Sequence, residues 1–204
     1  MNSIQLPADP EQIAQLRIGD SISVTGTVVT ARDAAHHYIW HELVHGDPSG
    51  EDLEIYSRLK RILHRGIIYH AGPIMKRSGD VWKCISAGPT TSIREESYEA
   101  DIIREFNLAG VIGKGGMGEY THTSLCGQKA VYLNAVGGAG ALAARCIAEA
   151  VEVLKPGFGI PEAMWVLEIT DFPAVVTMDS AGSSLHRDIE DSSSKRFHEM
   201  YPSQ

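Results

Sequence analysis

The clearest pattern in the chain is the alternation of apolar and polar residues over SISVTGTVVT (21–30). Apolar side chains recur there at nearly every second position, and several are β-branched, which predicts a half-buried strand. The stretch KRSGD (76–80) predicts the turn of a hairpin. Other apolar runs bounded by turn residues predict strands over 67–73, 82–88, 108–113, 130–136, 164–170 and 174–180.

Apolar residues at helical spacing predict helices over 9–17, 31–45, 53–65, 95–106, 119–127 and 141–154. The last of these is alanine-rich and is expected to be long. Because helices and strands are interspersed and no linker divides them, we expect one α+β domain over 1–182. The polar tail, 183–204, is expected to be a loosely docked helix or a frayed end.

The composition narrows the class of protein. The 204-residue chain has 18 Lys and Arg against 26 Asp and Glu, and this charge of −8 argues against nucleic-acid binding. No run of 18 apolar residues occurs and the N-terminal stretch lacks signal-peptide features, so we expect cytoplasmic residence and no membrane partner. Cys84, Cys126 and Cys146 are widely spaced, which favours reduced thiols over disulfides or a metal site.

Candidate chemistry is concentrated in residues 88–118, which begin with GPTTSIR (88–94) and end with GKGGMG. The two threonines and the serine stand where the chain enters a predicted helix, so backbone N–H groups and hydroxyls are expected to point outward together. Arg94 adds a planar guanidinium that suits a carboxylate, and Lys114 can complement it as a point charge. The pattern indicates an anion site. Helix capping beside a surface arginine is the alternative.

HELVH (41–45) matches the H-E-x-x-H pattern of zinc hydrolases. On a helix, His41 and His45 would share one face as zinc ligands, and Glu42 would be the general base. Gly-Asp-Pro follows immediately and ends the helix, and no third histidine stands at the expected spacing. A solvated, histidine-rich helix face is the alternative.

GKGGMG (113–118) fits the G-x-G-x-x-G pattern of dinucleotide sites and follows a predicted strand. The next predicted strand offers Asn134 in place of the acidic residue that binds ribose. Lys114 is followed by glycine, so the loop is not a P-loop. A tight glycine loop that carries a functional lysine is the alternative.

Several blocks of the chain resemble, in order, the β subunit of class I fumarases and of the related L-tartrate dehydratases. TARDAAH (30–36) and GPTTSIR (88–94) are the specific motifs. The matching blocks cover most of the chain, at 19–36, 67–94, 110–118, 130–144 and 159–182. The resemblance implies an α+β fold of the three-layer β/β/α swivelling type.

The resemblance also implies a hydro-lyase that reversibly hydrates fumarate to malate. In this family a separate α subunit, or an N-terminal domain when the two parts are fused, carries the catalytic [4Fe-4S] cluster. This chain would therefore ligate no metal and would work in an αβ or α2β2 assembly. By position in the matching motifs, Thr90 is implied as the catalytic base, with Arg32, Arg94 and Lys114 as contacts to a dicarboxylic acid. A free hydroxyl is a poor base, so nearby cations would have to stabilise the Thr90 alkoxide.

Other assignments stay open. His36 is expected either to assist in the pocket or to be a structural histidine near a helix start. L(+)-Tartrate dehydration and mesaconate hydration are alternatives of the same class, because the substrates differ by a hydroxyl or a methyl group. A stand-alone domain that binds a dicarboxylate or a nucleotide, and a zinc hydrolase, are alternatives of other classes. The sequence departs from the family pattern at His37-Tyr38, at Ser183-Ser184 and in the loop 46–56.

Overall fold

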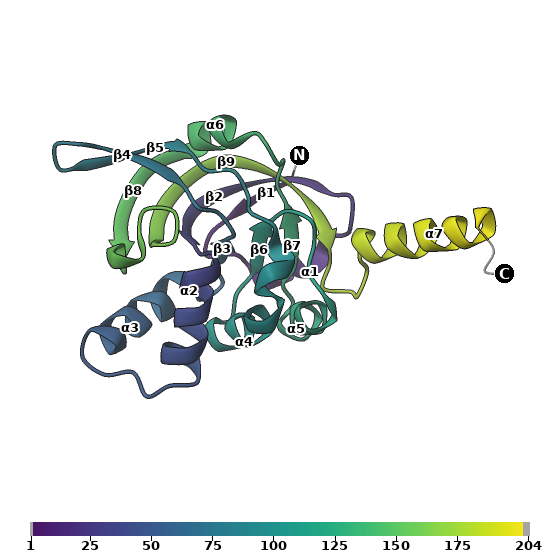
Figure 1. Cartoon of the computed structure of the whole chain (residues 1–204), viewed down its shortest axis with the longest axis horizontal. Coiled ribbons are helices and arrows are strands. Elements are labelled where there is room, and N and C mark those ends of the chain that lie inside the picture. Colours follow the sequence, from purple (N-terminus) through teal and green to yellow (C-terminus); the bar gives the residue numbers. More distant parts are fainter. Residues whose placement is uncertain (1, 202–204) are drawn as a thin grey trace.

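Four parallel strands form the centre of the computed structural model, which describes residues 2–201 (Figure 1). They pair side by side in the order β2 (Ser21–Thr30), β3 (Ile67–Tyr69), β6 (Gly110–Gly113) and β7 (Val131–Asn134). Parallel strands require crossover connections, and helices provide them here. The crossover helices are α2 (Asp33–Tyr38), α3 (Glu51–Leu63), α4 (Glu96–Phe106) and α5 (Glu119–Gln128).

β9 (Met164–Met178) closes the sheet on itself. It runs antiparallel to β2 over most of its length and antiparallel to β7 near its end. The strand order β1-β2-β3-β6-β7-β9-β8 therefore returns to β2, with β1 (Asn2–Gln5) and β8 (Ile147–Leu154) as outer strands. Figure 1 shows the strong curvature of β2, β8 and β9 that accompanies this closure.

Two apolar cores separate three layers. The first core lies between the parallel strands and the curved layer of β8 and β9, and includes Tyr69 and Trp165. The second lies between the parallel strands and helices α2 to α5, and includes Leu59 and Phe106. Successive residues of β2 divide between the two cores, as the pleat of a strand requires. The expected α+β class and its β/β/α layering are therefore confirmed.

Most elements expected from the pattern are present. The strand over 21–30 has the same bounds in the structure, where its alternating apolar side chains Ile22, Val24 and Val28 fill the first core and Val29 packs in the second. The predicted hairpin is formed by β4 (Ile74–Ser78) and β5 (Val81–Ser86), and it turns at Gly79 with a φ of 62°. The helix expected over 9–17 is α1 (Pro10–Gln15), and α3, α4 and α5 lie within a few residues of their expected bounds. Short 3-10 turns occupy Ser92–Glu95 (η2), Ala144–Cys146 (η3) and Pro156–Phe158 (η4).

The segment 141–154 contradicts the expected helix. Only α6 (Gly140–Ala143) and η3 are helical, and the rest is β8, which pairs antiparallel with β9. Its β-branched residues suit a strand, so pairing with β9 outweighs the helix propensity of its alanines. The two strands expected at 164–170 and 174–180 are one strand, β9. Asp171 adopts a left-handed conformation, with a φ of 49°, at which β9 bends without ending.

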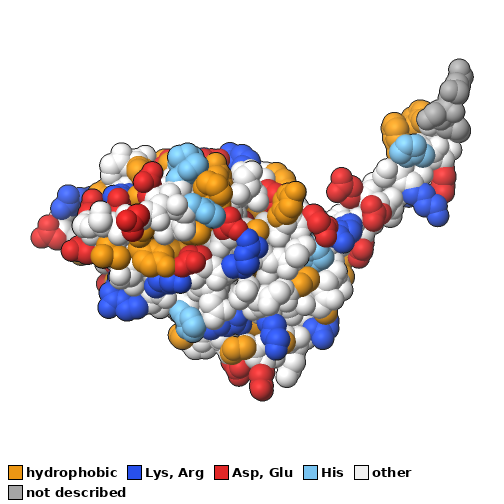
Figure 2. Space-filling view, turned by 90° about the horizontal axis from the view of Figure 1, so that it is seen from below, with side chains coloured by type: hydrophobic (Ala, Val, Ile, Leu, Met, Phe, Trp, Pro, Cys, Tyr) orange, Lys and Arg blue, Asp and Glu red, His pale blue; other side chains and the backbone are white. Residues whose placement is uncertain are grey.

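α7 (Leu185–Met200) extends away from the rest of the molecule, as Figures 1 and 2 show. Ser184 caps its start by accepting from the Arg187 N–H, and the Arg187 side chain contacts Glu119 and His122. Beyond this first turn the helix is exposed. The tail expected over 183–204 is thus helical as far as Met200, and its last three residues lie outside the described part. None of the helices within residues 2–201 has the length and apolar character needed to cross a membrane.

Leu167 tests the contribution of β9 to the fold. The side chain is fully buried in the first core, so Leu167→Ala is expected to lower the free energy of unfolding by about 2–5 kcal/mol through lost burial and a residual cavity. Urea denaturation measures the loss. Leu53→Ala on α3, where the side chain is 48% exposed, is the control and is expected to change stability by at most about 0.5 kcal/mol. Equal losses in the two variants would contradict this assignment of the core.

Candidate functional site

The carboxyl ends of the parallel strands bring three polar side chains to one edge of the sheet. Arg32 follows β2, His70 follows β3 and Lys114 follows β6. Because these strands run in the same direction, the residues that follow them lie along the same edge of the sheet. Topology alone therefore gathers two of the predicted cations at one place.

The segment GPTTSIR (88–94) crosses this edge as a turn that is anchored by its backbone. The Thr90 N–H donates to the His70 carbonyl at 2.7 Å, and the Ser92 N–H donates to the Lys114 carbonyl at 3.1 Å. These two N–H groups are not available to an anion, so the expected outward direction is wrong at Thr90 and Ser92. The side chains of the turn are therefore the contacts to consider first.

Asp33 links two of the predicted cations. Its Oδ2 lies 3.0 Å from Arg94 Nη2 and 3.7 Å from Arg32 Nη2. Arg94 Nη2 also donates to the Thr90 hydroxyl at 2.8 Å. The side chains of Arg32 and Arg94 are 26% and 43% exposed. Thr90, Arg94 and Arg32 thus meet around one carboxylate on an accessible surface.

Arg32 is held in place from two sides. Its Nε lies 3.3 Å from Glu162 Oε1, on the segment that precedes β9. Gly72, in the turn after β3, packs so closely that an added Cβ would lie 2.6 Å from Arg32 Cδ. The same Cβ would lie 2.7 Å from the Pro161 carbonyl oxygen, so the glycine of HAGP (70–73) is required by close packing against both the arginine side chain and this backbone.

Lys114 reaches the same turn from the next strand. Its backbone bridges to Thr91 in parallel register. Its side chain runs along the glycine loop after β7, where a Cβ added to Gly137 would lie 3.3 Å from Lys114 Cδ. Unlike Arg32 and Arg94, Lys114 forms no ion pair among residues 2–201. The fourth candidate residue therefore lies at the turn with its charge unpaired in this part of the chain.

His36 lies beneath this surface. Its ring is fully buried, with Nδ1 3.0 Å from the Arg32 carbonyl oxygen and Nε2 2.8 Å from Glu99 Oε2. Burial lowers the pKa of His36, but the hydrogen bond and negative charge of Glu99 outweigh burial, so the pKa lies above its ordinary value. His36 holds the backbone of Arg32 and presents no surface to a ligand, as the structural alternative expects.

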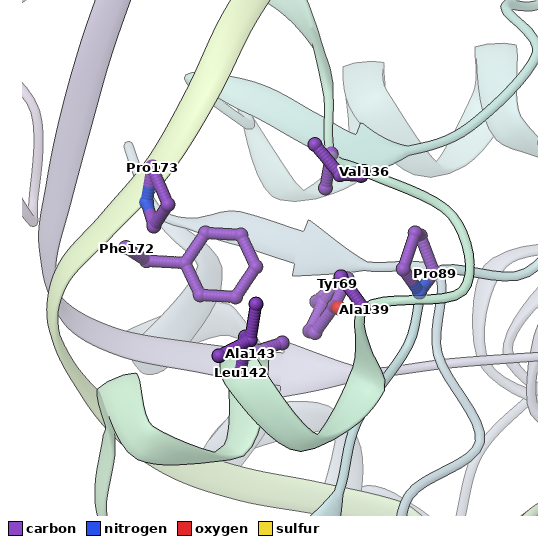
Figure 3. A pocket seen from close by; sticks show the side chains of 9 residues that line it. Tyr69, Pro89, Val136, Ala139, Leu142, Ala143, Phe172 and Pro173 are labelled. Atoms are coloured by element: carbon purple, nitrogen blue, oxygen red, sulfur yellow. The ribbon is translucent and has the colours of Figure 1, made fainter.

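An apolar pocket of about 180 Å³ opens next to the turn (Figure 3). Pro89 of the turn, Val136, Leu142 and Phe172 are among its walls, and no charged side chain lines it. A dicarboxylate would lose its hydration there without gaining a cationic partner. The candidate site is therefore the cationic group around Asp33.

The geometry of HELVH does not support a zinc site. The helix expected over 31–45 changes after α2 into a π-helical turn, η1 (Ile39–Val44). His45 Nε2 lies 3.0 Å from Asp101 Oδ2, and the Trp40 ring packs against both His41 and His45. In the chain from residue 2 to residue 201, the metal-ligating atoms that gather in one place belong to His36, His70 and Glu99.

The glycine-rich loop does not offer a pyrophosphate site. The N–H groups of Gly118 and Thr121, at the start of α5, donate to the Glu96 carboxylate at 2.7 Å and 3.1 Å. A negatively charged side chain thus occupies the position that a phosphate takes at a helix N-terminus. Gly116 also packs against the His186 ring, where an added Cβ would overlap it. The alternative, a tight loop that presents Lys114, agrees with this packing.

The three cysteines do not fit an iron–sulfur cluster. Cys84, Cys126 and Cys146 are free and lie on β5, α5 and η3. Burial raises the pKa of each thiol, whereas cluster ligands are thiolates.

Sequence reasoning missed the acidic side chains of the region. Asp33 directly follows Arg32 in TARDAAH, which was the available signal. Glu95 and Glu99 stand on the same helix face as the apolar residues at 102, 103 and 106, and both are fully buried. Two acids on an apolar helix face indicate a buried polar network.

Comparison with known proteins agrees with this arrangement of motifs. Residues 1–189 match the family described as Fumarase C-terminus. A Geobacillus stearothermophilus protein, provisionally named as a class I fumarate hydratase, is 46% identical over 198 residues, or 96% of this chain and 35% of that protein. A Methanocaldococcus jannaschii protein, provisionally named as L(+)-tartrate dehydratase subunit beta, is 36% identical over 192 residues, or 93% of each chain. The L(+)-tartrate dehydratase subunit beta of Escherichia coli K12 is 36% identical over 180 residues, or 88% of this chain and 83% of that subunit.

This chain thus spans 35% of the length of the Geobacillus relative but most of the length of the two β subunits. The family match extends over all of the strands and helices that build the candidate site. The chain belongs to the fumarase C-terminus family.

Proposed function

We propose that this chain is the β subunit of an iron–sulfur-dependent hydro-lyase that reversibly hydrates fumarate to malate. The observation that carries the proposal is the convergence of Arg32 and Arg94 on the Asp33 carboxylate, beside Thr90. Guanidinium groups that converge on one carboxylate form a place where the carboxylate of a ligand can bind. The name of the Geobacillus relative supports fumarate as the substrate.

In the proposed complex, a substrate carboxylate replaces Asp33 between the two guanidinium groups. The Asp33 side chain is 48% exposed, and ion pairs at such surfaces contribute at most about 1 kcal/mol, so the replacement costs little. Lys114 offers its charge to the second carboxylate from the neighbouring strand end. The three cations then orient both ends of a dicarboxylic acid.

Thr90 is the proposed base in the direction of dehydration. Its alkoxide oxygen takes the proton from the carbon beside a carboxylate and becomes a hydroxyl, while the C–H electron pair forms the double bond and hydroxide leaves the neighbouring carbon. The hydroxide then takes the proton of the Thr90 hydroxyl and departs as water, which regenerates the alkoxide. Arg94 donates to the Thr90 oxygen at 2.8 Å and so stabilises negative charge on it. Such stabilisation is required because a neutral hydroxyl is a weak base.

The [4Fe-4S] cluster is proposed to reside on a partner α subunit, in an αβ or α2β2 assembly against which this domain swivels. When bound, the cluster supplies a Lewis acid for the leaving hydroxyl group. The names of the β-subunit relatives support a partner, and the longer Geobacillus protein can hold both parts in one chain. The free thiols support a reducing compartment, such as the cytoplasm.

L(+)-Tartrate dehydration is the second candidate, favoured by the names of the Methanocaldococcus and Escherichia subunits. Tartrate differs from malate by one hydroxyl group, and mesaconate differs from fumarate by one methyl group. A site that pairs the extra hydroxyl discriminates strongly, whereas a methyl group changes rates far less.

Anaerobic co-expression of this chain with a cluster-bearing α subunit tests the function. The purified complex is expected to interconvert fumarate and malate faster than it dehydrates L-tartrate. Tartrate turnover alone would select the second candidate. If an intact cluster gives no turnover of fumarate, L-tartrate or mesaconate, while the chain alone binds malate, the stand-alone binding domain replaces the hydro-lyase.

Thr90→Ala tests the proposed base. The variant is expected to lose about 10²-fold to 10⁴-fold in kcat, because proton removal from carbon loses its acceptor, while KM changes little. Steady-state kinetics of the αβ complex measure both constants. Thr123→Ala, on the exposed face of α5, is the matched control and is expected to keep wild-type rates. Near-wild-type turnover by Thr90→Ala would rule out the assignment.

Arg94→Lys tests the cationic anchor. Arg94 contacts both Asp33 and Thr90 through Nη2. Lysine keeps the charge but loses the planar fork that can donate two parallel hydrogen bonds to a substrate carboxylate, so KM for the dicarboxylate is expected to rise by about 10-fold to 100-fold. The control is Arg104→Lys on α4, where the side chain is 51% exposed and pairs with Asp101. Similar KM values in the two variants would argue against substrate contact by Arg94.

A further inference from the structure

A network of buried titratable side chains lies directly beneath the cationic group. His36, His70, Glu95 and Glu99 have no exposed side-chain surface. They come from α2, the end of β3, η2 and α4, and they meet where these elements pack together. Buried charge is costly unless it is paired and hydrogen-bonded, and the mechanism proposed above uses none of these groups.

Glu99 is the centre of this network. Its Oε2 lies 2.8 Å from His36 Nε2 and 3.1 Å from His70 Nε2. A carboxylate accepts hydrogen bonds and cannot donate them, so both Nε2 atoms carry protons. His36 Nδ1 faces the Arg32 carbonyl oxygen at 3.0 Å and must donate as well. With both ring nitrogens protonated, His36 is an imidazolium ion paired with the Glu99 anion.

His70 is the neutral member of the network. Burial is the largest influence on the pKa of His70, and together with the charged His36 ring 4.9 Å away it lowers this pKa below its ordinary value although Glu99 raises it. With its proton on Nε2, His70 accepts at Nδ1 from the Ser92 hydroxyl at 2.9 Å. Ser92 accepts in turn from the Tyr132 hydroxyl at 2.8 Å. This branch joins Glu99 to the middle of the turn that carries Thr90 and Arg94.

Glu95 is the second acid that faces His36, with Oε2 3.5 Å from Nδ1. Burial raises the pKa of Glu95, and the negative charges of Asp33 and Glu99 raise it as well. The positive charges of His36 and Arg94 lower it, but the pKa remains above its ordinary value. Burial acts in the same direction on Glu99, but His70 and His36 outweigh it and lower the pKa of Glu99. The Glu99 anion and the His36 cation therefore pair with each other, and burial shifts both Glu95 and His70 toward their neutral forms.

We propose that Glu99 is a positioning residue for the substrate site. Through His36 it fixes the backbone of Arg32, and through His70 and Ser92 it fixes the turn of Thr90 and Arg94. Ser92 is tightly packed against β6, because a Cβ added to Gly113 would overlap Ser92 Oγ. The catalytic consequence rests on the proposed function, whereas the network and its hold on the turn can be measured without turnover.

Nitrogen-resolved NMR of the imidazole rings in the full chain tests the charge states. At a pH of about 7.5, roughly one unit above the ordinary histidine pKa, His36 is expected to be doubly protonated and His70 to carry its proton on Nε2. In Glu99→Gln the side chain loses its negative charge and keeps one acceptor oxygen for the Nε2 protons of both His36 and His70. His36 is therefore expected to become neutral and to titrate at a lower pH than in the wild-type chain. Glu105→Gln on the same helix, which bonds Tyr56 and Lys60 outside the network, is the matched control.

Hydrogen exchange of the Thr90 and Ser92 amides tests the hold on the turn. These N–H groups donate to the His70 and Lys114 carbonyls, and Glu99→Gln is expected to speed their exchange by at least about 10-fold relative to Glu105→Gln. In the complex with the α subunit, Glu99→Gln is expected to lose about 10-fold to 100-fold in kcat/KM, and Glu99→Asp to recover part of the loss.

Each outcome decides the proposal. A neutral His36 in the wild-type chain, or unchanged amide exchange and kcat/KM in Glu99→Gln, overturns it and leaves the hydro-lyase assignment intact. Zinc binding is a further outcome that overturns the proposal. If the wild-type chain binds one equivalent of zinc and His70→Gln does not, His36, His70 and Glu99 are metal ligands. If His36 is an imidazolium and the amides exchange faster in Glu99→Gln, the positioning role is supported. If the complex then turns over no dicarboxylate, it is the proposed function that fails and not the positioning role.

Discussion

A carboxylate with no access to water imposes the central constraint on this fold. Glu99 lies on a helix face that otherwise packs apolar side chains against the sheet, and an unpaired anion there would cost several kcal/mol. His36 and His70 supply its partners from two other elements. The positions of α2, the end of β3 and α4 are therefore set by hydrogen-bond geometry, which is more directional than apolar packing. The candidate site inherits this precision because it is built on the same segments.

The closure of the sheet by β9 supports the site from the opposite side. The chain that enters β9 carries Glu162, whose carboxylate accepts from the Ala34 N–H at the start of α2 at 3.1 Å and pairs with Arg32. Thr30, at the end of β2, accepts from the Trp165 N–H of β9 at 3.0 Å. Arg32 is thus fixed between a strand that closes the sheet and a histidine that is tied to α4. Loss of either contact would displace the same guanidinium.

The parts of the fold that were predictable are those whose pattern is local. β2 shows its full alternation in sequence, and the hairpin and the helices α3 to α5 have their own spacing and turn residues. β8 was predicted as a helix because its alanines have helix propensity and its partner β9 is distant in sequence. The backbone bonds that occupy the Thr90 and Ser92 amides are also non-local, so the sequence indicated free N–H groups there.

The same limit applies to the candidate site. The residues alone indicated an anion site around the hydroxyls of GPTTSIR (88–94), Arg94 and Lys114. Only the resemblance added Arg32 and gave Thr90 the role of base. The Glu99 bonds to His36 and His70 join positions 63 and 29 residues apart, so no short motif contains them. A buried acid on an apolar helix face is visible in sequence, but the histidines that neutralise it are identified only once the strands are paired.

The exposure of the cationic group explains why such a site needs a second surface. The Arg94 side chain is 43% exposed, and Thr90, which it contacts, is partly exposed. In water the field of a guanidinium at hydrogen-bond distance is screened, and it stabilises an alkoxide far less than it does in a dry site. Covering the turn would exclude water and so strengthen the contacts that Arg32 and Arg94 make with one carboxylate. Such a site therefore needs two things, a rigid network below the turn and a second surface that covers the turn when substrate is bound. This chain supplies the network.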